Sequence, residues 1–121
     1  MKAIRIDATS RTISEVDYSG DYRQILVLID AELFDCARFN RKGDAVFVSD
    51  IGMLDGTDHF FRIAGYRHPL AGNGLILGCD GEGNSTNPSV SLAWVTENTA
   101  FLTRGQVLDM FSGQDDGHEI E

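Results

Sequence analysis

Hydrophobic and polar residues alternate at the start of the chain in a pattern that predicts a β-hairpin. In KAIRID (residues 2–7) apolar residues alternate with charged ones, and TISEV (residues 12–16) carries a second apolar stretch. Residues 7–11 between them are rich in polar, turn-forming side chains. Alternation at period two on both sides of a polar turn is typical of two short paired strands.

The next apolar run, residues 25–29, has no polar interruption and fits a buried helix or a buried strand. Helical spacing of the apolar residues around it favours a helix over about residues 20–31, with Ser19 as the cap and Asp21 in the first turn. Phe34, Cys36 and Phe39 follow with the spacing of a strand. The residues at helical spacing are Tyr22, Ile25, Leu26, Ile29 and Leu33.

The middle of the chain reads as consecutive strands. A turn is expected at residues 40–44, followed by a strand in which Val46 and Val48 share one face and Phe47 lies on the other. After a loop at residues 53–59, FFRIAG (residues 60–65) predicts a strand with aromatic side chains on both faces.

Five glycines fall within residues 68–84, around the short apolar run 75–77. We interpret this segment as a bend, a short strand and a turn at residues 80–84, with glycines supplying positive φ and close backbone approach. The spacing of Gly72, Gly74 and Gly78 is GxGxxxG and no helix follows, so the dinucleotide-binding fingerprint is not met.

Residues 91–103 allow two interpretations. They form either two strands around residues 96–98, or a short helix starting at Ser91 and then a strand. Thr103 and Gln106 have the spacing of a capping box, which predicts a helix over residues 106–111. Its inward-facing residues would be Val107, Leu108 and Phe111.

These elements predict an α+β fold: a small mixed or antiparallel sheet of about six strands with one or two helices packed on one side. Strands follow one another without alternating helices, which favours this class. The 121 residues fit a single domain over residues 1–111, followed by an acidic, disordered tail at residues 112–121.

Composition and charge narrow the range of expected locations and binding partners. No apolar run reaches the ~20 residues of a membrane helix, and no signal peptide is evident, so we expect a cytoplasmic protein. The formal net charge is −9, which disfavours direct binding of nucleic acid and suits a basic protein partner. Cys36 and Cys79 are expected to be buried thiols. The tail contributes Asp115, Asp116, Glu119 and Glu121 to this charge.

Candidate catalytic and metal-binding patterns are weak. The segment from Asp80 to Asn84 lacks the glycine and glutamate positions of an EF-hand and is explained by a turn. Asp58, His59 and His68 do not have metal-ligand spacing. A pair of Cys79 with a histidine would be needed for nucleophilic catalysis. We therefore predict no enzyme, no catalytic residues, no metal and no cofactor.

Part of the chain resembles a small family of unknown function carried by phages, plasmids and other mobile elements. The resemblance is strongest over residues 65–92, and KAIRID and TISEV at the start are similar too. Ala93-Trp94 stand where such proteins are expected to have acidic residues. The resemblance implies an accessory protein of a bacterial cytoplasm and no particular activity. The residues that carry it are Gly65-Tyr66, Pro69-Leu70-Ala71-Gly72, Leu75-Ile76-Leu77, Gly78, Asp80, Glu82-Gly83 and Ser91-Leu92.

We expect a non-enzymatic module that binds another protein, with a homodimer through exposed strand edges near Phe60, Phe61 and Trp94. The first alternative is a small-molecule or nucleotide binder that uses the glycine-rich loops of residues 65–84 as an anion-binding nest. The second alternative is an inhibitor of a host defence nuclease by acidic mimicry. The ligand-binding residues of the first alternative are Tyr66, Arg67, His68, Gly72, Asn73 and Gly74.

Overall fold

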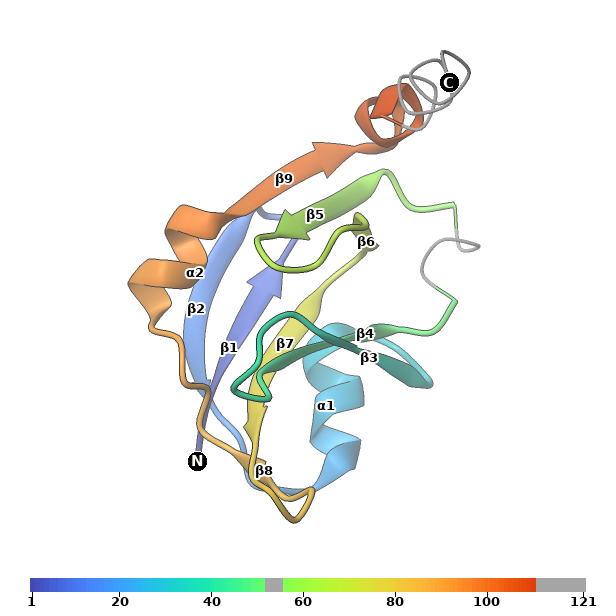
Figure 1. The fold of residues 1–121 in the computed structure, drawn as a ribbon. Helices are drawn as coiled ribbons and strands as arrows, with labels where there is room; N and C mark the ends of the chain where they lie inside the picture. Colours follow the sequence, from blue (N-terminus) through green and yellow to red (C-terminus); the bar gives the residue numbers. More distant parts are fainter. Residues whose placement is uncertain (52–55, 111–121) are drawn as a thin grey trace.

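The structure, a computed structural model, describes residues 1–51 and 56–110 (Figure 1). Its helices are α1 (Tyr22–Ile29) and α2 (Leu92–Asn98), and residues 104–110 are also helical. Its strands are β1 (Lys2–Asp7), β2 (Thr12–Asp17), β3 (Phe34–Arg38), β4 (Ala45–Ser49), β5 (His59–Ile63), β6 (Leu70–Ala71), β7 (Gly74–Cys79), β8 (Ser85–Thr86) and β9 (Thr99–Thr103).

The strands form two antiparallel sheets. The larger sheet has the order β2-β1-β7-β4-β3, and the short strand β8 adds to β7 as its sixth member. The smaller sheet has the order β6-β5-β9. The predicted α+β class with an antiparallel sheet of about six strands is confirmed, and the second sheet is an addition that the sequence did not indicate.

The larger sheet is covered on both faces. On one face, Leu75 and Leu77 of β7 pack with Ile25 and Ile29 of α1. Helix α1 lies beside β7 and β4 (Figure 1). On the other face, a second cluster joins the sheet to β5 and to Val95 of α2. The two helices therefore lie on opposite faces of the sheet, where the sequence suggested a single side.

Local hydrogen bonds explain where α1 begins. Asp21 is its N-cap, because the carboxylate of Asp21 accepts a hydrogen bond from the backbone N–H of Arg23 at 3.0 Å. The prediction that Ser19 caps this helix is wrong. The Ser19 hydroxyl instead accepts a hydrogen bond from the backbone N–H of Asp21, the N-cap residue itself, at 3.3 Å.

The C-terminal segments settle the open choice for residues 91–103. The Ser91 hydroxyl accepts from the backbone N–H of Trp94 at 3.0 Å and starts α2, so the interpretation as a helix followed by a strand is confirmed. The capping box is confirmed too, by reciprocal bonds of 2.8 and 3.2 Å between Thr103 and Gln106. Leu108 is 55% exposed, so its predicted inward position is wrong. Phe111 and the predicted tail lie outside the described residues.

One buried carboxylate links the β3–β4 turn to the segment before α2. Asp44 is 1% exposed. It accepts hydrogen bonds from the side-chain amide of Asn40 at 2.9 Å, from the backbone N–H of Ser89 at 2.9 Å, and from the Ser89 hydroxyl. Burial alone would raise the pKa of Asp44, but the bonds from Ser89, Asn40 and the Val90 backbone outweigh it and lower the pKa.

We predict that Asp44→Asn lowers the free energy of unfolding by about 2 kcal/mol. The amide removes the negative charge and one acceptor oxygen, which leaves a donor unpaired in a buried site. Urea unfolding of the variant measures the loss, and Asp35→Asn, at an exposed position of β3, is the control. A midpoint equal to that of the control would show that Asp44 is not a stabilising link.

The lowered pKa of Asp44 also predicts how this loss depends on pH. A carboxyl group with a depressed pKa in the folded state stabilises the fold above its unfolded pKa of about 4, and the contribution disappears as the pH falls through the folded pKa. The stability difference between wild type and Asp44→Asn should therefore be largest near neutral pH and shrink below about pH 4. A difference that stays constant down to pH 2 would contradict this assignment.

Candidate functional site

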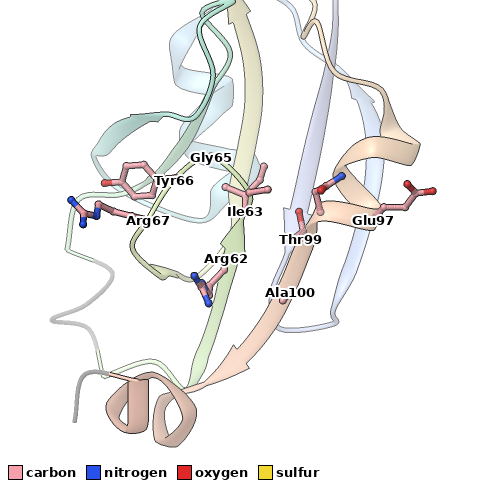
Figure 2. A pocket seen from close by; sticks show the side chains of 10 residues that line it. Arg62, Ile63, Gly65, Tyr66, Arg67, Glu97, Thr99 and Ala100 are labelled. Atoms are coloured by element: carbon pink, nitrogen blue, oxygen red, sulfur yellow. The ribbon is translucent and has the colours of Figure 1, made fainter. Parts of the chain in front are cut away.

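The sequence-predicted residues Tyr66 and Arg67 line a pocket of about 550 Å³ between the end of β5 and the junction of α2 with β9. Figure 2 shows that the side chains around it diverge: Tyr66 and Arg67 lie on one side, whereas Glu97 points away on the other. The pocket thus has a wide mouth and no convergent set of polar groups. Its lining residues are Arg62, Ile63, Ala64, Gly65, Tyr66, Arg67, Glu97, Asn98, Thr99 and Ala100.

The structure does not bring the other predicted ligand-binding residues into this pocket. His68 packs edge-on against the ring of Tyr66, with ring centroids 5.9 Å apart. Gly72 and Asn73 line a different hollow of about 130 Å³, and Gly74 lies in the buried core. Tyr66 and Arg67 thus line one hollow and Gly72 and Asn73 line another, and ligand binding by the predicted residues stays a prediction.

The segment 72–74 has a structural role. Gly72 has a φ of +78° and turns the chain from β6 of the smaller sheet into β7 of the larger one. The side-chain oxygen of Asn73 accepts from the backbone N–H of Ala8 at 3.0 Å. A Cβ on Gly74 would stand 2.7 Å from a methyl carbon of Val46 and 2.8 Å from the ring of Phe61. This bears out the prediction that the glycines supply positive φ and close approach.

We predict that Gly74→Ala destabilises the protein by about 2 kcal/mol, because the added methyl group overpacks a closed core. Gly81→Ala is the matched control, since a Cβ on Gly81 meets nothing within 4 Å. Thermal unfolding followed by circular dichroism measures both variants. Equal melting temperatures for the two would mean that the core yields at Gly74 and that close packing there is unimportant.

The two cysteines are more accessible than predicted. Cys36 is exposed and Cys79 is half-buried, so the expectation of two buried thiols is wrong. Both line a hollow of about 120 Å³ that also contains Arg38. Desolvation raises the pKa of the Cys36 thiol. The charge of Arg38 acts to lower this pKa, whereas Cys79 acts to raise it further. The Cys36 thiol is therefore protonated at neutral pH, which is unfavourable for a nucleophile.

The other candidate catalytic and metal-binding residues either form structural hydrogen bonds or lie apart from one another. A carboxylate oxygen of Asp58 accepts from the backbone N–H of Arg104 at 3.0 Å. Within residues 1–51 and 56–110, no three or more histidine, cysteine, aspartate or glutamate side chains are grouped to hold a metal ion. In the same part of the chain, no helix is long and apolar enough to span a membrane.

Phe60 and Phe61, expected at a dimer surface, are buried within the chain, so this prediction is wrong. Phe61 packs in the cluster between the sheets, and Phe60 packs with Val107 on the other side of β5. Trp94 is half-buried and stacks on Phe39, with ring centroids 6.0 Å apart. The prominent aromatic side chains therefore stabilise the fold.

A different exposed surface, which we name the α1–β4 surface, carries large apolar side chains. Val27 of α1 is 78% exposed, and Ile51 after β4 is 51% exposed. Val27 and Ile51 line an open hollow of about 540 Å³ with Leu26, Asp30, Ala31, Glu32 and Ser49.

The sequence contained a signal for the α1–β4 surface that went unused. A helix that packs on a sheet through one face cannot bury five consecutive apolar residues, because successive side chains are 100° apart around its axis. On such a helix the run 25–29 exposes at least one of them, and the structure exposes Val27. Ile51 could not be placed beside Val27 without the tertiary fold.

Comparison with known proteins finds no matching family model, no matching curated protein and no matching solved structure. The resemblance to a family carried by mobile elements therefore stays a prediction.

Proposed function

We propose that the protein is a binding module for another protein and that the α1–β4 surface makes the contact. The observation that carries this proposal is the exposure of Val27 and Ile51, which line one open hollow together with the half-buried Leu26. Scattered exposed apolar side chains are normal, but large ones gathered at one hollow are characteristic of an interaction surface. Burial of one such side chain contributes about 1.5–3 kcal/mol.

The rim of the surface favours a basic partner. Asp30 and Glu32 line the hollow, and Asp50 precedes Ile51. All three are exposed, and none of them forms an ion pair with a described residue. The net charge of −9 adds a field of the same sign, which accelerates encounter with a positively charged protein. The partner would thus offer an apolar side chain flanked by lysine or arginine.

The apolar centre also bears on the alternative of acidic mimicry. A mimic of nucleic acid needs carboxylates spaced like phosphates along one face. On the α1–β4 surface the carboxylates of Asp30 and Glu32 line the same hollow as apolar side chains, which suits a protein partner better than a nucleic-acid-binding cleft. Within this proposal the protein acts without catalysis, as an accessory protein in the cytoplasm.

Selection of peptides from a random display library against the purified protein tests the proposal. We expect enriched peptides to combine an apolar residue with lysine or arginine. Val27→Asp together with Ile51→Asp should weaken their binding at least tenfold, because charged groups would replace the apolar contact. Both positions are exposed, so the double variant should fold as the wild type does by circular dichroism.

Leu108→Asp is the matched control, since Leu108 is similarly exposed but lies in the C-terminal helix, outside the α1–β4 surface. It should leave peptide binding unchanged. Peptides without basic residues, or binding that Leu108→Asp weakens as much as the double variant does, would overturn the proposal.

A further inference from the structure

Strand β3 is an edge strand whose outer backbone groups can be identified from its pairing. The carbonyl of Leu33 accepts from Asp50 N–H, and the N–H of Phe39 donates to the carbonyl of Asp44. In an antiparallel pair, alternate residues bond to the neighbouring strand. With the observed register, the odd-numbered residues of β3 therefore face β4, and the N–H and C=O groups of Phe34, Cys36 and Arg38 point outward.

This outer edge is open in the described part of the chain. No described residue forms a hydrogen bond with the outward backbone groups of Phe34, Cys36 or Arg38. The side chains of Cys36 and Arg38 are exposed as well. An unprotected edge of this kind is a template for one more strand.

Charges of opposite sign stand at the two ends of this edge. Asp30 and Glu32 precede β3, whereas Arg41 and Lys42 follow it in the turn to β4. All four side chains are exposed, and none is ion-paired within the described residues. A strand that runs antiparallel to β3 with the same charge order would meet opposite charges at both ends.

We propose that a second copy of this chain pairs with β3 through β3 itself, around a twofold axis at Cys36. In this register Phe34 lies opposite Arg38 of the other copy, and the outward groups form about six hydrogen bonds across the axis. Residues 30–32 of each copy then lie beside residues 40–42 of the other. The two larger sheets join into one continuous sheet, a closed and self-complementary arrangement.

The other sheet edges fit a second copy less well. The edge strand β2 has Arg11 before it and Asp17 at its end, but Asp17 is already bonded to Lys2 at 2.9 Å. Strand β9 has Glu97 before it and Arg104 after it, but the Arg104 guanidinium already donates to the carbonyl of Thr57 at 2.9 Å and lies over the ring of Phe60. Strands β6 and β8 have only two residues each. The inference goes beyond the proposed function, because self-association at β3 requires neither Val27 nor Ile51.

Sedimentation equilibrium of Cys36→Pro tests the proposal. Proline removes only the outward N–H of this residue and spares the bonds to β4. We expect the wild type to have twice the 13.3 kDa mass of one chain, and Cys36→Pro to have the monomer mass. Glu15→Pro is the matched control, because its N–H points outward from β2 by the same alternation, and it should stay dimeric.

A wild-type protein that is monomeric at 100 μM overturns the proposal. So does a dimer that Glu15→Pro dissociates and Cys36→Pro leaves intact. If Cys36→Pro does not fold, cross-linking with a bismaleimide at Cys36, in the variant Cys79→Ser, tests the same pairing of β3 by the amount of covalent dimer formed. Paired Cα atoms at the axis would be about 5.5 Å apart, so covalent dimer should form. The control is the double variant with Cys36→Ser and Cys79→Ser, which has no thiol to cross-link. A cross-linked fraction no higher than in this control would contradict the pairing of β3 with β3 of a second copy.

Charge exchange tests the register. Glu32→Lys and Arg41→Glu should each weaken self-association at least tenfold, because like charges then meet at both ends. An equimolar mixture should restore the dimer, since each end again faces its opposite. A mixture that dissociates as readily as either variant alone would exclude the proposed register. Peptide binding at the α1–β4 surface is tested separately, by the effect of Val27→Asp together with Ile51→Asp, so that self-association and partner binding can fail independently.

Discussion

Burial of β7 on both faces is the constraint on which the rest of the structure depends. Five of its six residues, 74–78, are buried, and it pairs with β1 on one side and with β4 on the other. Leu75 and Leu77 face α1, whereas Ile76 faces the second sheet. The absence of a side chain at Gly74 lets Val46 and Phe61 close over the start of the strand. The glycine-rich segment therefore builds the core.

Two consequences of this arrangement bear on function. With β7 at the centre, β3 is left as an edge strand whose outer backbone groups have no bond to a described residue. Helix α1 covers the centre of the sheet with Ile25 and Ile29, and its apolar side chain Val27 faces solvent. The proposed partner surface and the proposed dimer edge are thus the parts of α1 and of the sheet that the core leaves uncovered.

Local patterns in the sequence predicted most elements, because they depend on neighbouring residues. The first hairpin, the helix around Ile25 and the capping box of Thr103 and Gln106 are all formed within a few residues. The second sheet was missed, because β6 has only two residues and because β9 pairs with β5, from which it is separated along the chain by β6, β7, β8 and α2. The bond between Asp44 and Ser89 spans 45 residues and left no local signal.

The candidate site was predicted less well for the same reason. The sequence grouped Tyr66 with Gly72 because they are close along the chain, but the two residues line separate hollows. It also assigned Phe60 to an exposed surface, since a strand with aromatic residues on both faces looks exposed until a second layer covers it. Which apolar residues remain exposed is decided by tertiary packing.

Amide hydrogen exchange along β3, measured by NMR at low and high protein concentration, tests the account most directly. The amides of Asp35 and Ala37 bond to β4 and should be protected at every concentration. The amides of Phe34, Cys36 and Arg38 should exchange rapidly in dilute solution and become protected as the concentration rises. Exchange of these three that does not change with concentration would contradict self-pairing at this edge.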